Sequence, residues 1–142
     1  MNDVIFLTAI NSDISNIGPT VKEILFLLSK HIPHISKEDI IDIKLILSEA
    51  ISNAIIHGNH KDKNKRVVIK AMIINTAKVM FKIEDEGYGF DYKNFLQNIK
   101  FQDIYREDGR GFLLINSLSD SIEFFKNGRE LHICKTVVHD YV

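Results

Sequence analysis

The chain has 142 residues, 45% of them hydrophobic, which is enough for one core, so we expect a single domain over residues 1–142. Its 18 basic and 19 acidic residues give a net charge of −1, which excludes binding to nucleic acid or to an anionic membrane through a whole-chain field. Cys134 is the only cysteine, which excludes a disulfide framework and a thiolate metal cluster and favours a reducing compartment.

The first part of the chain predicts a strand followed by a helix. The N-terminus lacks the basic flank and long apolar core of a signal peptide, and no apolar run approaches membrane-spanning length, so we expect a cytoplasmic protein. Residues 4–10 are mostly apolar and indicate a strand. After Gly18-Pro19, apolar residues recur at helical spacing, which predicts a helix that stops before Pro33.

A long helix is predicted next, over residues 37–57. Ser36 followed by Asp39 resembles a capping box at its start, and Gly58 is a suitable helix-ending residue. The polar run over residues 58–66 then indicates an exposed loop.

Two strand-like runs follow the loop, over residues 67–74 and 78–85. They are joined at Asn75-Thr76, a connection short enough for a hairpin. Residues 91–108 mix charges with four aromatic residues and show no sustained period, so we expect a long loop with one helical turn.

The last part of the chain predicts a helix over residues 111–118 and a second hairpin. The runs 122–125 and 131–138 flank Asn127-Gly128, which is a strong hairpin signal. The order of elements is therefore β-α-α-β-β-loop-α-β-β. This order indicates an α+β fold with helices packed on one face of a largely antiparallel sheet.

Three places carry possible chemistry, and the first is on the long helix. Glu49, Asn53 and His57 recur at four-residue spacing and line one stripe of an otherwise apolar helix. We expect Glu49 to be at least partly buried, where an ionised carboxylate is costly unless it is paired or lies near a metal. Alone, the stripe also fits a solvated face, and His57 fits a helix-end residue that contacts terminal carbonyls.

The second place is Asp85-Glu86-Gly87-Tyr88-Gly89-Phe90, directly after a strand. The apolar residues of that strand alternate, and Asp85 continues their phase, so its carboxylate should face inward. There it can accept a hydrogen bond from an exocyclic amine such as that of adenine, while Gly87 and Gly89 allow a tight turn beside a ligand. Alone, the segment also fits an ordinary strand-ending turn.

The third place is the Gly109-Arg110-Gly111 segment, where glycines precede the helix over residues 111–118. Free amides at a helix N-terminus bind phosphate, and glycines permit close approach. The segment has neither the Walker pattern nor the dinucleotide fingerprint. Each signal is ambiguous alone, but their conjunction beside one expected cleft favours a nucleotide site.

These residues resemble a known family of ATP-binding domains. Residues 48–58, SEAISNAIIHG, are similar to the N box of GHKL domains, and most similar to that of the bacterial anti-sigma serine/threonine kinases. Residues 85–90 are similar to the G1 box, and residues 109–115 to the G2 box. The resemblance implies a Bergerat fold, a two-layer α/β sandwich whose mostly antiparallel mixed sheet is covered by helices on one face.

The resemblance also implies roles in binding ATP and Mg²⁺. Asn53 would coordinate the metal, Asp85 would receive the adenine amino group, Gly87 and Gly89 would shape the adenine pocket, and residues 91–108 would be the lid. Lys93, Lys100 and Arg106 are three lid cations that could reach the γ-phosphate, and the resemblance does not choose among them. The remaining nucleotide-site residues that it implies are His57, Phe90, Gly109, Arg110, Gly111 and Phe112.

For the whole protein, the resemblance implies an ATP-dependent serine/threonine protein kinase that is also an anti-sigma factor. Glu49 would be the base for the hydroxyl of a small anti-anti-sigma protein of the STAS type, and the second partner would be a sigma factor bound by the kinase homodimer. No direct contact with nucleic acid or a membrane is implied. Three alternatives remain: a nucleotide-gated binding module, the catalytic domain of a histidine kinase acting in trans, and an α+β domain without a nucleotide.

Overall fold

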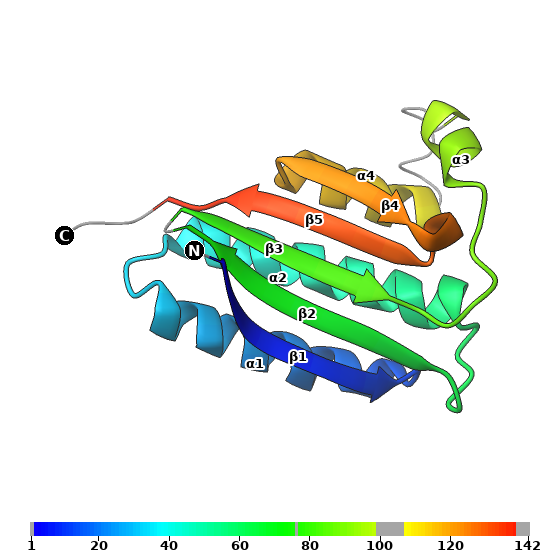
Figure 1. Ribbon diagram of the computed structural model, residues 1–142, viewed down its shortest axis with the longest axis horizontal. Helices are drawn as coiled ribbons and strands as arrows, with labels where there is room; N and C mark the ends of the chain where they lie inside the picture. The colour runs from blue at the N-terminus through cyan, green and yellow to red at the C-terminus, as the bar shows by residue number, and fades with distance from the viewer. Residues whose placement is uncertain (1, 76, 99–106, 139–142) are drawn as a thin grey trace.

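The computed structural model describes residues 2–75, 77–98 and 107–138 (Figure 1). Its sheet has five strands in the order β1-β2-β3-β5-β4, and all four pairings between them are antiparallel. The α+β prediction is thus confirmed, and no parallel pairing of a mixed sheet occurs among the described strands. The strands are β1 Asn2–Asn11, β2 Arg66–Ile74, β3 Lys78–Glu84, β4 Ser121–Phe125 and β5 Glu130–Thr136.

Three helices cover one face of the sheet, and a fourth lies at one end of the fold (Figure 1). The covering helices are α1 Ile17–His31, α2 Lys37–Asn53 and α4 Glu107–Leu118; the separate helix is α3 Tyr92–Asn98. Short helical turns span Ile14–Asn16, Ala54–Gly58 and Lys126–Gly128. None of the described helices is long and apolar enough to span a membrane.

Alternation along the strands places the core between the sheet and the helices. In β3 the side chains of Val79, Phe81 and Ile83 are buried, whereas Met80 and Lys82 between them are half-buried on the opposite face. Burial of one such apolar side chain contributes about 1.5–3 kcal/mol. Other core residues are Ile24, Leu28, Ile43, Leu47, Ile51, Val67, Ile69, Ala71 and Ile133.

Both predicted hairpins are confirmed. Strand β2 pairs with β3, and β4 pairs with β5. Asn75 in the first turn has a φ of 58°, and Asn127 and Gly128 in the second have φ values of 58° and 89°. Asparagine and glycine adopt this left-handed conformation at low cost, which is why these residue types signal the turns.

The long helix departs from its prediction in its last turn. It starts as predicted, because the Asp39 amide donates to Ser36 Oγ at 3.1 Å. It is α-helical only to Asn53, however, and the turn Ala54–Gly58 is π-helical, with the amide of Asn59 donating to the carbonyl oxygen of Ala54 at 2.9 Å. Such turns are rare and are frequently found at functional sites.

Two further departures concern the segment before and at the start of α4. Where a single helical turn was expected, α3 has seven residues. Helix α4 begins at Glu107 rather than at Gly111. Its apolar periodicity starts only at Phe112, so the pattern could not reveal a polar first turn. Residues 99–106 of the predicted lid, including Lys100 and Arg106, lie outside the described residues.

A buried lysine joins three elements at the end of the fold where β5 ends. Lys135 Nζ donates to the carbonyl oxygen of Leu118 at 2.8 Å and lies 3.6 Å from Asp39 Oδ1 and 3.7 Å from Asp42 Oδ2. The side chains of Lys135 and Asp39 are each 10% exposed. The lysine therefore compensates carboxylates that would be costly to bury alone.

We expect Lys135→Met to lower the free energy of unfolding by about 3 kcal/mol, because it keeps the apolar stem but leaves the two carboxylates uncompensated. Urea unfolding measures the change, and Lys37→Met, at an exposed position of α2, is the control. A loss no larger than that of the control would show that the ion pairs contribute no net stability.

Candidate functional site

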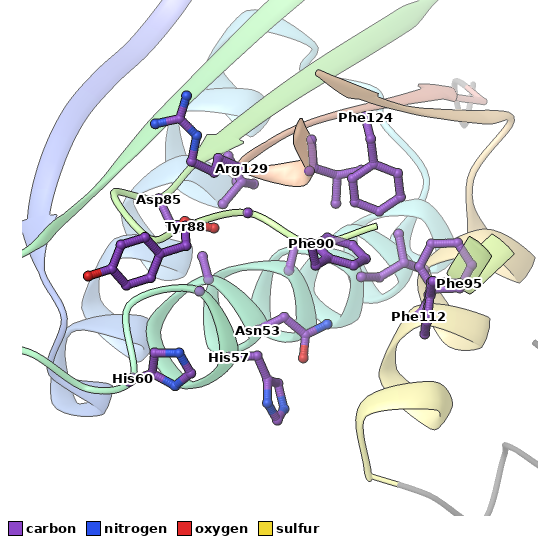
Figure 2. A pocket seen from close by; sticks show the side chains of 18 residues that line it. Asn53, His57, His60, Asp85, Tyr88, Phe90, Phe95, Phe112, Phe124 and Arg129 are labelled. Carbon is purple, nitrogen blue, oxygen red and sulfur yellow. The ribbon is translucent and has the colours of Figure 1, made fainter. Parts of the chain in front are cut away.

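A cavity of about 310 Å³ opens where the end of α2, the loop after β3, the β4–β5 turn and α4 meet. Figure 2 shows Asp85 and Tyr88 toward one end of this cavity, Phe95 and Phe112 toward the other, and Asn53 between them. The full lining is Ala50, Asn53, Ala54, His57, Gly58, His60, Ile83, Asp85, Tyr88, Gly89, Phe90, Phe95, Phe112, Ile115, Phe124, Gly128, Arg129 and Leu131.

Asp85 is a half-buried carboxylate in the cavity wall, as the alternation of β3 predicts. Its amide donates to the carbonyl oxygen of Arg129 at 2.9 Å, and its Oδ1 accepts from the Gly87 amide at 2.8 Å. Burial raises the pKa of Asp85, while the Gly87 amide and the Arg129 charge oppose the rise. The carboxylate is thus held as a hydrogen-bond acceptor at the cavity surface.

Two glycines let the π-helical turn after α2 approach this carboxylate directly. A Cβ on Gly58 would lie 2.3 Å from Asp85 Oδ2, and a Cβ on Gly87 would lie 2.1 Å from the carbonyl oxygen of Gly58. Any side chain at either position would push the loop of residues 85–90, here called the G1-like loop, away from the helix. The two glycines therefore allow the close packing of these two backbone segments beside Asp85.

The polar stripe of α2 packs against α4. A Cβ on Gly111 would lie 2.6 Å from Glu49 Oε2 and 3.5 Å from Asn53 Nδ2, so both side chains reach the backbone of α4. Glu49 is half-buried, which confirms the expected partial burial, and Asn53 also lines the cavity. The structure therefore brings the first and third predicted places together.

An aromatic cluster forms the other end of the cavity and holds α3 in place. Phe95 of α3 packs edge-on against Phe112 of α4, with ring centroids 5.1 Å apart. Phe90 and Tyr92 each contact Phe124 of β4 at 5.4 Å. Such pairs contribute about 0.5–1.5 kcal/mol each beyond area burial. These contacts fix the first part of the predicted lid to the sheet.

The predicted site residues divide into those that line the cavity and those that do not. Among them, the lining residues are Asn53, His57, Asp85, Gly89, Phe90 and Phe112. Gly87 and Gly111 lie close to lining residues, and Glu49 lies close to Gly111. Arg110 is exposed and is not in the lining, and of Gly109 the structure describes only its place in α4.

The glycines do not precede α4 as expected, because the helix begins earlier. Gly109 lies in the first turn, where backbone amides lack intrahelical partners, and Gly111 lies in the second turn. Gly111 therefore lies within α4 and not before it. Its observed role is steric, since it lets α4 approach Glu49.

The β4–β5 region contributes residues to the cavity lining that the sequence did not predict as site residues. Phe124, Gly128, Arg129 and Leu131 line the cavity, although the turn was recognised only as a hairpin. The carbonyl oxygen of Asn127 accepts from the Phe90 amide at 2.8 Å, which folds this turn over the G1-like loop. No local pattern encodes that contact. The other lining residues that were not predicted as site residues are Ala50, Ala54, Gly58, His60, Ile83, Tyr88, Phe95 and Ile115.

Comparison with known proteins shows which proteins this chain is similar to. Residues 18–135 match the family model of the histidine kinase-like ATPase domain. Serine-protein kinase RsbW from Staphylococcus aureus, strains JH9 and Newman, is 33% identical over 95 residues, which cover 63% of this chain and 60% of that protein. The match thus spans less than two thirds of these curated relatives. Because the family model covers most of the chain, the chain belongs to the histidine kinase-like ATPase family.

Proposed function

We propose that this chain is an ATP-dependent serine/threonine protein kinase that also acts as an anti-sigma factor. One observation carries the proposal: Gly111 packs against Glu49 and Asn53 beside the cavity that contains Asp85. A candidate proton acceptor, a candidate metal ligand and a candidate carboxylate for recognition of adenine thus lie in one region of the protein. The similarity to proteins named serine-protein kinases supports the same reading.

The residues present fit ATP with Mg²⁺. The cavity has an apolar wall that includes Ile83 and Leu131, and a half-buried carboxylate at Asp85. Glycines stand beside it at positions where a Cβ would clash with neighbouring atoms. The carboxamide of Asn53 offers an oxygen, the ligand type that Mg²⁺ takes. When bound, ATP would supply the γ-phosphoryl group, and Mg²⁺ would neutralise part of the phosphate charge.

Within this proposal, each polar residue has a distinct task. Asp85 accepts a hydrogen bond from the adenine amino group, and Asn53 holds the metal. Glu49 accepts the proton of a serine or threonine hydroxyl on the partner. The hydroxyl oxygen bonds to the γ-phosphorus as the bond from that phosphorus to the bridging oxygen of ATP breaks, and ADP is the leaving group. His57, Phe90 and Phe112 complete the nucleotide site as parts of the cavity lining.

The phosphates are expected near the start of α4. The free amides of its first turn, which includes Gly109, favour an anion there, and Arg110 is an exposed cation beside them. Residues 91–108 serve as the lid in this proposal. The structure describes residues 91–98 and 107–108 of this segment, and Lys93 is exposed on α3.

The proposed partners follow from the family resemblance. The substrate is an anti-anti-sigma protein of the STAS type, and the second partner is a sigma factor bound by a homodimer of the kinase. Both encounters take place in the cytoplasm, without direct contact with nucleic acid or a membrane.

The direct test is calorimetry of ATP binding with and without Mg²⁺, followed by transfer of phosphate to the anti-anti-sigma partner. We expect Mg²⁺-dependent binding and phosphate on a serine or threonine of that partner. Absence of ATP binding would contradict the proposal. Binding without transfer would favour the alternative, a nucleotide-gated binding module, which one observation supports: Glu49 is not among the residues that line the cavity.

We expect Asp85→Asn to weaken ATP binding by about 10- to 100-fold without lowering the melting temperature of the nucleotide-free protein. The carboxamide can keep the hydrogen bond from the Gly87 amide but is a weaker acceptor for the adenine amine. The raised pKa means that protonated Asp85 stabilises the fold below the unfolded-state pKa, and that this contribution is lost as pH rises through the folded-state pKa. The neutral asparagine avoids the free-energy cost of burying the ionised Asp85 carboxylate at neutral pH.

The same pKa shift predicts a pH dependence of binding. ATP affinity of the wild type should fall as pH decreases through the raised pKa of Asp85, at a higher pH than an ordinary aspartate would give. Calorimetry over a pH series measures this, and Asp85→Asn should lack the step. If the variant loses stability and keeps its affinity, Asp85 is only a turn residue.

A further inference from the structure

Asn59 is a buried polar residue at the end of the π-helical turn, and the proposed function gives it no task. It is 0% exposed. Its Nδ2 donates to Ser12 Oγ at 2.8 Å and to the carbonyl oxygen of Arg66 at 3.0 Å, and its Oδ1 accepts from the Glu86 amide at 2.8 Å. The carboxamide therefore uses both donors and its oxygen in hydrogen bonds within the protein.

These hydrogen bonds join segments that are far apart in the sequence. Ser12 follows β1, Arg66 starts β2, and Glu86 lies in the loop after β3. The backbone of Asn59 belongs to the end of the long helix, since its amide donates to Ala54 at 2.9 Å. The side chain of Asn59 thus connects the end of the helix to the ends of three strands. Buried networks with every partner satisfied specify one arrangement of the groups they join.

The segment that Asn59 holds is the one that carries Asp85. Glu86 lies between Asp85 and Gly87, whose amide donates to the Asp85 carboxylate at 2.8 Å. On the helix side, Gly58 precedes Asn59 and packs against the same carboxylate. Asn59 therefore connects the two backbones between which the Asp85 carboxylate lies. A loop released from Asn59 can move relative to Gly58, and the carboxylate moves with it.

We propose that Asn59 is a positioning residue for base recognition, which fixes the Asp85–Gly87 loop against the helix end and so sets the preference of the cavity for a base with an exocyclic amino group. This inference rests on the proposed function, because it assumes that Asp85 receives that group. Asn59 itself does not line the cavity and acts through Asp85.

The test compares ATP with purine riboside triphosphate, which lacks the amino group, by calorimetry in the presence of Mg²⁺. We expect Asn59→Ala to weaken ATP binding and to change binding of the analogue much less, so that the preference for ATP falls by about tenfold. Asn64→Ala, at an exposed asparagine in the same loop, is the matched control and should keep the wild-type preference.

A double-mutant cycle separates positioning from general stability. In the Asp85→Asn background, Asn59→Ala should cause no further loss of preference, since the group through which it acts is already altered. Equal loss for both nucleotides, or the same loss of preference in that background, would overturn the inference. Asn59→Ser, whose hydroxyl is too short to reach the Glu86 amide but leaves room for water, provides the same comparison if Asn59→Ala does not fold.

Different results would contradict the proposed function and the role of Asn59. A wild type that binds ATP in preference to the analogue, together with an unchanged preference in Asn59→Ala and Asn59→Ser, overturns the role of Asn59 alone. A wild type that binds neither nucleotide overturns the proposed function and this inference together.

Discussion

Glu49→Gln should slow phosphoryl transfer to the partner by roughly 10²- to 10⁴-fold, the usual contribution of a general base, with little change in the Kd of ATP. A glutamine side chain has the size of the glutamate, so the close contact with Gly111 is retained. The carboxamide cannot accept the proton of the serine or threonine hydroxyl. Loss of transfer with retained binding is the signature of an interaction used only in the reaction.

Single-turnover transfer of the γ-phosphate to the anti-anti-sigma protein measures this effect, with ATP binding followed by calorimetry. Glu38→Gln, at an exposed position in the first turn of α2, is the matched control and should transfer at the wild-type rate. An unchanged rate in Glu49→Gln would exclude Glu49 as the base, and the proton would need another acceptor.

Asn53→Ala should weaken ATP binding in the presence of Mg²⁺ by at least about 100-fold while the domain stays folded. Loss of a supporting group around a metal already costs up to roughly 100-fold, and Asn53 is proposed as a direct ligand. The side chain is only half-buried, so its removal leaves no large cavity in the core.

Calorimetry with and without Mg²⁺ measures this effect, because a metal ligand should affect only binding that depends on the metal. Asn116→Ala, at an exposed position of α4, serves as the control. Circular dichroism checks that both variants are folded. If Asn53→Ala keeps its Mg²⁺-dependent affinity, the assignment of the metal ligand is refuted.

Local sequence patterns predicted the elements that are set by burial of an apolar face. The alternation of β3 placed Asp85 in the phase of Phe81 and Ile83, and the structure has it at the cavity surface. The four-residue spacing of Glu49 and Asn53 placed both on one stripe of α2, and both contact Gly111. These predictions succeed because strand and helix periods determine side-chain direction without reference to distant residues.

Predictions that depended on element ends or on distant contacts were less complete. The start of α4 was placed four residues late, because its first turn has no apolar residue to mark it. The π-helical turn after Asn53 was not foreseen, since it accompanies contacts of Gly58 and Asn59 with residues far away in the sequence. Local propensity contains no information on such contacts.

The sequence by itself determined which face of each strand and helix is apolar, where the hairpins turn, and which residue types could bind a nucleotide. Only the tertiary structure decided that the β4–β5 turn, through Gly128 and Arg129, closes over the G1-like loop, and that Asn59 fastens this loop to the end of α2. The physical reason is range. Periodicity and turn chemistry act over a few residues, whereas the cavity is formed by segments that meet only when the apolar face of the sheet is buried against the helices.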